Sequence, residues 1–326
     1  MANGNGMQAG SHGNVSPDDS AGPSLSIAEG GGHSFGGTWT EEKLQILRHY
    51  LNAYMQVMKN QPFELVYIDA FAGTGRREET TGSMTGDEIG LFPPEDNGER
   101  QRFHEGSASI ALQLERPFDY YWFVEQDAAR YEQLRGLREQ FPALRPRMIF
   151  EHGDANAALP KLLQQHNWKK TRAVLFLDPY GANMDFDTMR QIARIPAVDV
   201  WVLFPLGQAV NRMLTRDFAQ MHPSWAVRLD RIFGTADWQK RFYTTQNAPS
   251  LFPVNPVTTK TCGWNEITEF YKERLETIFA KVASETKLLK NSTNVPLFAF
   301  LFAMANPSPK AQNAALRIAN HILKHG

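Results

Sequence analysis

Short apolar runs alternate with helical patterns along most of the chain, and this alternation limits the fold more than any other feature. The runs carry apolar residues at consecutive positions, which is typical of strands buried on both faces of a parallel sheet. They span residues 65–70, 120–124, 148–150, 173–177 and 198–204. Helical patterns lie between them at residues 107–115, 128–140, 155–166 and 186–195. This regular alternation predicts an α/β fold, a doubly wound sheet with helices on both faces.

Further elements flank the alternating region. Apolar residues recur at helical spacing from Leu44 to Val57 and predict an amphipathic helix that begins near Thr40. Later in the chain, strands are expected near residues 282–289 and at 297–305, followed by a helix at 310–324. The predicted sheet therefore has seven strands, most of them parallel. Residues 208–253, after the fifth strand, are expected to form a small helical insertion.

Two polar segments interrupt this plan. Residues 1–36 are rich in Gly, Ser and Asn, and they contain almost no bulky apolar side chain before Phe35. Such a tail cannot bury enough surface to offset its ordering entropy, so we expect it to be disordered and the folded domain to span residues 37–326. The connection at residues 76–105 exceeds the usual limit of about 12–15 residues for a loop. It is a candidate lid, with disorder of its acidic middle as the alternative.

Cysteine content excludes two kinds of site, and the net charge weakens the case for a nucleic-acid-binding function without excluding it. Lys and Arg number 34 and Asp and Glu 35, so the net charge of −1 gives no global attraction to nucleic acid and any such binding must use a local patch. The sole cysteine, Cys262, excludes an internal disulfide framework and a Cys-rich metal site, and we expect no metal. No signal peptide or membrane-length apolar stretch is visible. The expected location is the cytoplasm.

Residues 69–75, with the sequence DAFAGTG, follow the first predicted strand directly. Gly73 and Gly75 would let the backbone turn tightly and approach a ligand closely. A dinucleotide fingerprint needs a third small residue where Glu78 stands, and no phosphate-cradling P-loop motif is present. A ligand without phosphates, with an amino-acid moiety beside Asp69 and the glycines, fits better. The alternative is a purely structural glycine pair.

Acidic residues follow three later strands. Glu125 closes the second strand, where a carboxylate can accept hydrogen bonds from ribose hydroxyls, although a solvated strand-end carboxylate is the alternative. Asp154 follows the third strand and could accept from an adenine amine, cap the next helix, or do both. Asp178, Pro179 and Tyr180 follow the fourth strand. There a carboxylate on a proline-stiffened turn could hold an aromatic amino group while the neighbouring ring stacks on a base; a structural Asp-Pro turn is the alternative.

In this order the motifs resemble motifs I to IV of the class I S-adenosylmethionine-dependent methyltransferases, which have a Rossmann-like fold. The chain is most similar to the three-Cys-motif partner proteins (TcmP), a family named after a partner that bears three cysteines. The residues that carry the resemblance are Trp39 with Lys43, residues 67–76 including Phe71, Gly106 with Ser107, residues 123–125, residues 178–181 and residues 204–207. The resemblance implies an S-adenosylmethionine cofactor and a possible cysteine-motif partner protein.

The layout is also similar to that of the adenine-N6 methyltransferases of ribosomal RNA. That similarity implies that Lys43 and Ser107 help to hold the methionine carboxylate and that Asp178 positions the target amine. The present chain departs from the Asp-Pro-Pro-Tyr motif of those enzymes, because it has one proline and Gly181 stands at the tyrosine position. A different acceptor therefore stays open.

Three functions follow from these observations. The first is methyl transfer to a base amino group of RNA or DNA, with Arg and Trp side chains of residues 208–253 gripping the nucleic acid; the alternative is that those aromatics form the insertion's own core. The second is a non-catalytic or partner-dependent binding subunit. The third is methylation of a small molecule or peptide, which the near-neutral charge favours.

Overall fold

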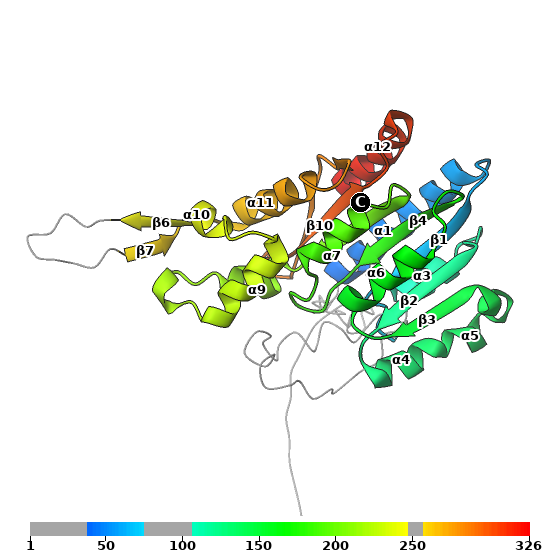
Figure 1. Cartoon of the computed structure of the whole chain (residues 1–326), viewed down its shortest axis with the longest axis horizontal. Coiled ribbons are helices and arrows are strands. Elements are labelled where there is room, and N and C mark those ends of the chain that lie inside the picture. The colour runs from blue at the N-terminus through cyan, green and yellow to red at the C-terminus, as the bar shows by residue number, and fades with distance from the viewer. Residues whose placement is uncertain (1–37, 75–105, 247–256) are drawn as a thin grey trace, which may run out of the picture. The chain divides into compact units, whose positions relative to one another are not determined.

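A mostly parallel sheet of eight strands forms the centre of the computed structural model, which describes residues 38–74, 106–246 and 257–326 (Figure 1). The strands are β1 (Glu64–Asp69), β2 (Tyr120–Glu125), β3 (Met148–His152), β4 (Thr171–Leu177), β5 (Val198–Phe204), β8 (Lys281–Val282), β9 (Lys287–Lys290) and β10 (Pro296–Met304). Their order is β3-β2-β1-β4-β5-β10-β8, with β9 also paired to β10. Strands β1 to β5 are parallel, and β10 runs antiparallel to β5. The predicted fold class is confirmed.

The strand count differs from the prediction at one edge of the sheet. The strand expected near residues 282–289 is divided into β8 and β9, both paired with β10. Val282 pairs with Ala303 and Lys287 pairs with Phe300, so the stretch between the two pairs is longer on this side than on β10. The extra residues must leave the ladder, and the polar sequence at 284–286 tolerates that exposure.

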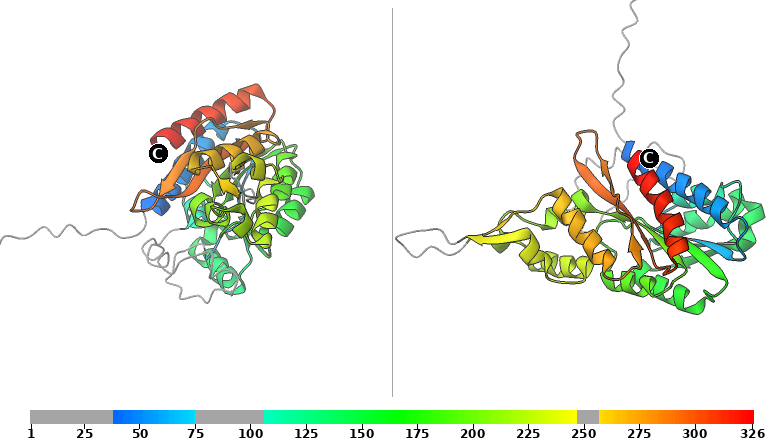
Figure 2. Two further views of the ribbon diagram at one scale, coloured as in Figure 1. Left: turned by 90° about the vertical axis from the view of Figure 1, so that its left-hand side faces the viewer. Right: turned by 90° about the horizontal axis from the view of Figure 1, so that it is seen from above.

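Helices cover both faces of the sheet, as the alternation predicted (Figures 1 and 2). On one face lie α1 (Thr38–Met58), α3 (Ser107–Leu112), α4 (Ala128–Arg135), α5 (Leu137–Gln140) and α12 (Pro309–His325). On the other lie α6 (Ala155–Gln165), α7 (Phe186–Ala193) and α11 (Trp264–Glu276). In β1, Leu65 and Tyr67 point to the first face and Val66 and Ile68 to the second, so alternate side chains fill two separate cores.

The segment after β5 contains the expected helices and a two-stranded sheet that was not expected. The segment begins with a short π-helix, η3 (Leu206–Val210), and continues through α8 (Asn211–Met213), η4 (Phe218–Gln220), α9 (Pro223–Phe233) and α10 (Trp238–Phe242). Strand β6 (Tyr243–Gln246) then pairs antiparallel with β7 (Val257–Lys260). Trp238 and Phe242 are fully buried, and Phe242 packs against Phe270 of α11 with ring centres 5.2 Å apart. These aromatics are buried, as the alternative interpretation expected, but they belong to the core shared with the sheet and α11 and not to a separate core of the insertion.

The first and last helices support each other. Helices α1 and α12 lie side by side on the same face of the sheet (Figure 2). The ring of Trp39 in α1 lies 4.9 Å from that of Phe298 in β10, and the ring of Tyr50 lies 5.3 Å from that of Phe302. None of the described helices is both long and apolar enough to cross a membrane.

Candidate functional site

The predicted site residues gather at one edge of the sheet. Asp69 is the last residue of β1, Glu125 is the last residue of β2 and Asp178 follows β4 directly. Because parallel strands present their carboxyl ends at one edge, these three carboxylates lie on the same side of the molecule. The starts of α1 and α3 add Lys43 and Ser107 to the same place through direct hydrogen bonds. This edge is therefore where chemistry can be concentrated.

Asp69 lies at the centre of this arrangement and is fully buried. Its Oδ2 accepts hydrogen bonds from the Ser107 hydroxyl at 2.6 Å and the Tyr67 hydroxyl at 3.4 Å, and its Oδ1 accepts from the Phe71 amide at 3.4 Å. Burial raises the pKa of Asp69 to about 7, the Ser107 hydrogen bond opposes that rise, and the nearby Asp178 charge adds to it. A carboxyl group with this pKa ionises readily when a cation is placed beside it.

Lys43 and Asp178 form an ion pair across the site. The Lys43 Nζ lies 2.5 Å from Oδ2 of Asp178, and the two side chains are 7% and 26% exposed. The ammonium also lies 5.4 Å from the ring centre of Trp39, one turn earlier on the same helix. A lysine in this position holds its charge away from solvent and beside the carboxylate that follows β4.

Glu125 holds the glycine loop in place. Its Oε2 accepts a hydrogen bond from the Gly73 amide at 2.9 Å, and its Oε1 accepts from the Asp127 amide at 2.8 Å. Each carboxylate oxygen has a further lone pair, so Glu125 can accept additional hydrogen bonds from hydroxyl groups. Gly73 has a φ of +60°, and a Cβ built on it would meet no atom of the described residues within 4 Å. None of the described residues therefore fills the space beside Gly73, and Gly75 lies outside the described residues.

Two further predicted residues have clear structural positions. Asp154 caps α6, since its Oδ1 accepts a hydrogen bond from the Ala157 amide at 3.2 Å. The capping interpretation is confirmed, and the adenine contact stays a prediction. Phe71 packs partly buried against the core on the α6 and α7 side. The Gly153 amide donates to the Glu125 carbonyl at 3.0 Å, which keeps the turn before Asp154 next to the end of β2.

The turn after β4 carries Pro179, Tyr180 and Gly181, and its backbone is left-handed at Gly181. Pro179 is buried, Tyr180 is half-buried, and the Arg130 guanidinium lies 5.8 Å from the centre of the Tyr180 ring. Gly181 has a φ of +65°, which lies in the left-handed region that favours glycine. This conformation explains why glycine rather than tyrosine occupies the position, and it makes Tyr180 the aromatic residue of the turn.

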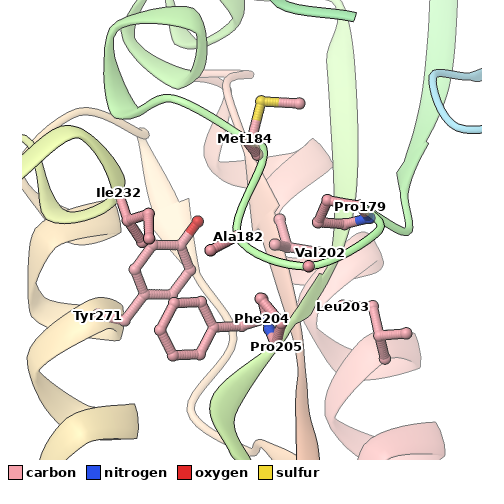
Figure 3. A pocket seen from close by; sticks show the side chains of 10 residues that line it. Pro179, Ala182, Met184, Val202, Leu203, Phe204, Pro205, Ile232 and Tyr271 are labelled. Atoms are coloured by element: carbon pink, nitrogen blue, oxygen red, sulfur yellow. The ribbon is translucent and has the colours of Figure 1, made fainter. Parts of the chain in front are cut away.

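A small apolar pocket lies beside this turn (Figure 3). Its walls include Pro179, Ala182 and Met184 from the turn, Phe204 from β5, Ile232 from α9 and Tyr271 from α11. The rings of Phe204 and Tyr271 stack with centres 4.0 Å apart. Burial raises the pKa of the Tyr271 hydroxyl, so the pocket wall is uncharged. Sequence reasoning missed Ile232 and Tyr271, which come from elements far along the chain.

The known proteins that this chain resembles are only distantly similar to it. No protein-family model and no curated protein matches the sequence. Among solved structures, a protein from Legionella pneumophila is 14% identical, covering 87% of this chain and 93% of its own, with a TM-score of 0.44. Spermidine synthase from Thermotoga maritima is 9% identical, covering 81% of this chain and 62% of that enzyme, with a TM-score of 0.37. Magnesium protoporphyrin IX methyltransferase from Synechocystis, solved with bound SAH, is 12% identical over 81% and 84%, with a TM-score of 0.35.

Proposed function

We propose that the protein is an S-adenosylmethionine-dependent methyltransferase related to the three-Cys-motif partner proteins. The observation that carries the proposal is the position of Gly73: no described residue fills the space beside it, and its amide donates a hydrogen bond to Glu125 near the buried Asp69. A nucleoside with an amino-acid side arm matches these groups. Its ribose hydroxyls can donate hydrogen bonds to Glu125 and its ammonium can pair with Asp69. It can also approach Gly73 closely, because glycine has no Cβ.

The other proposed contacts follow from the same placement. The residues assigned to the cofactor are Lys43, Asp69, Phe71, Gly73, Gly75, Ser107, Glu125, Asp154 and Asp178. Lys43 and Ser107 would take the methionine carboxylate, and Asp154 the adenine amine. The low exposure of Lys43 and Asp69 keeps water away, which strengthens charge-assisted hydrogen bonds in the site.

The acceptor side of the site is assigned to Asp178, Pro179 and Tyr180. S-adenosylmethionine, when bound, supplies an electrophilic methyl group on a good leaving group, so the protein's main task is orientation. Asp178 accepts a hydrogen bond from the acceptor amine, Pro179 stiffens the turn that carries it, and the Tyr180 ring stacks on a planar acceptor. A base amino group of RNA or DNA is the acceptor that this arrangement fits best.

A small-molecule acceptor is the second candidate. The near-neutral net charge of −1 favours it, because it gives the protein no global attraction to a phosphate backbone. Labelled methyl transfer to RNA, DNA, peptides and small aromatic amines separates the two candidates. Loss of transfer in Asp178→Asn with retained cofactor binding is the expected signature of the assigned role. Unchanged transfer in that variant would contradict it.

The cofactor itself is tested by calorimetric titration of S-adenosylmethionine and S-adenosylhomocysteine. We expect micromolar binding to the wild-type protein and none to an Asp69→Ala, Glu125→Ala double variant. The matched control is Glu132→Ala with Glu276→Ala, which removes two carboxylates at exposed positions on α4 and α11. Absence of binding to the folded wild-type protein would overturn the enzyme function and favour a binding subunit that needs its cysteine-motif partner.

A further inference from the structure

The proposed function places Lys43 on the cofactor and Asp178 on both the cofactor and the acceptor, and the two side chains are bound to each other. Lys43 is assigned to the cofactor carboxylate, and Asp178 also serves the acceptor amine, yet their side chains form an ion pair of 2.5 Å. The paired oxygen is Oδ2 of Asp178. While this pair persists, one of the two Asp178 carboxylate oxygens is held by an ammonium, and an acceptor amine must compete with that ammonium for the negative charge of Asp178.

Physical chemistry limits when Lys43 can leave Asp178. The Lys43 side chain is 7% exposed, and a buried ammonium needs an anionic partner close to it. Asp69 is another acidic group whose charge interacts with Lys43, but its carboxyl group is held by Ser107 and Tyr67. A new carboxylate that enters the site next to α1 is a better competitor for Lys43 than water is.

We propose that Lys43 exchanges partners when the cofactor binds, moving from Asp178 to the methionine carboxylate and so releasing Asp178 for the acceptor. This inference rests on the proposed function. It makes cofactor binding the step that opens the acceptor site, and it imposes an order in which the cofactor binds before the acceptor. Lys43 is thus a positioning residue for the acceptor side as well as a cofactor contact.

The exchange predicts that Asp178 opposes binding of the cofactor carboxylate. Neutralising Asp178 should therefore strengthen binding of a ligand that carries this carboxylate. Asp178 also attracts the sulfonium and the ammonium of the cofactor, and that attraction is lost in the same variant. Decarboxylated S-adenosylmethionine keeps both cations and lacks the carboxylate, so the ratio of the two ligands' affinities isolates the competition for Lys43.

The experiment measures both ligands by calorimetry against wild type, Asp178→Asn, Lys43→Gln and the double variant. In Asp178→Asn the affinity ratio should shift about fivefold in favour of S-adenosylmethionine, the size of a modest ion pair. In Lys43→Gln the ratio should fall, and adding Asp178→Asn should then change nothing. The matched control is Asp185→Asn, which removes a carboxylate that is 24% exposed and paired with Arg231, and it should keep the wild-type ratio.

Three outcomes are decisive. An unchanged ratio in Asp178→Asn, or the same shift whether or not Lys43 is present, would overturn the exchange while leaving the methyltransferase function intact. A shift that depends on Lys43 supports it. Failure of the folded wild-type protein, checked by circular dichroism, to bind either ligand would instead overturn the proposed function, and the exchange with it.

Discussion

Ser107 donates a hydrogen bond of 2.6 Å to the carboxylate of Asp69, joining the first residue of α3 to the last residue of β1. This bond stabilises the ionised form of a carboxyl group that burial otherwise keeps protonated, and the pKa of Asp69 is raised to about 7 as the net result. The site therefore holds a carboxylate whose charge changes near neutral pH.

Cofactor affinity should depend on pH through this group. The ammonium and sulfonium of S-adenosylmethionine favour ionised Asp69, so affinity should rise as pH increases through about 7. Ser107→Ala removes a hydrogen bond that lowers the pKa of Asp69, so the rise should move to higher pH. Calorimetry between about pH 6 and about pH 9 measures the midpoint. Ser109→Ala, a buried serine on the same helix, should keep the wild-type midpoint, and an unmoved midpoint in Ser107→Ala would refute the link.

Glu125→Gln should weaken every ligand that contains the ribose. The substitution removes the charge that strengthens hydrogen bonds from hydroxyls, and it loosens the Gly73 and Asp127 amides. We expect at least about a tenfold loss of affinity for S-adenosylhomocysteine and for methylthioadenosine alike. Lys43→Gln should spare methylthioadenosine, which has no carboxylate. Equal effects of the two variants on both ligands would contradict the assigned roles.

Two glycines with left-handed backbones should respond differently to a methyl group. Gly73→Ala should cost about 1 kcal/mol of stability from its φ of +60° and nothing from overlap with the described residues, none of which lies within 4 Å of the added Cβ. Its ligand affinity should fall sharply, since the methyl group occupies the approach to the loop. Gly234→Ala has a φ of +66° and a Cβ that overlaps the Phe186 ring, so about 1–3 kcal/mol more should be lost. Melting temperature and calorimetry together distinguish the two; a larger loss of stability in Gly73→Ala would be inconsistent with this geometry.

Asp199 should make the protein less stable as pH rises from acid towards neutral. Its carboxylate accepts a hydrogen bond of 3.0 Å from Tyr50, and burial raises its pKa to about 7. The folded state then binds more protons than the unfolded state between about pH 4 and about pH 7, so the free energy of unfolding falls across this range. Asp199→Asn removes this titrating group, so the free energy of unfolding should fall less steeply with pH. Part of the fall should remain, because the pKa of the buried Asp69 is also raised to about 7.

Urea unfolding at several pH values tests this prediction. Asp187→Asn, at an exposed position on α7, should retain the wild-type slope, and the same slope in Asp199→Asn would refute the prediction.

Much of the fold was predictable because buried strands carry a local signal. The observed bounds of β1 to β5 lie within two residues of the predicted runs, since a strand covered on both faces must be apolar at consecutive positions. Strands β6 and β7 carry no such signal. They consist mainly of Thr, Gln and Lys and are stabilised by pairing with each other, including a Thr245–Thr258 hydroxyl contact of 2.9 Å. Their existence follows from tertiary position rather than from hydrophobic pattern.

The site was predictable only where topology decides it. Strand ends determine that Asp69, Glu125 and Asp178 share an edge, whereas nothing in a sequence places Lys43 on Asp178 across 135 positions. That contact depends on the packing of α1 and on a side-chain rotamer. Tyr67 could have been found, because it stands two residues before Asp69 on the same face of β1. Tyr271 could not, because its position depends on how α11 packs against β5.

The contact between Trp39 and Phe298 has a consequence for biosynthesis. Helix α1 is among the first described parts of the chain to leave the ribosome, but the ring that supports it belongs to the last strand of the sheet. A nascent chain that already contains β1 to β5 can hold the middle of α1, because Tyr50 contacts Trp201 and Asp199 of β5. The start of α1, which carries Trp39 and Lys43, is fully packed only once β10 has been translated.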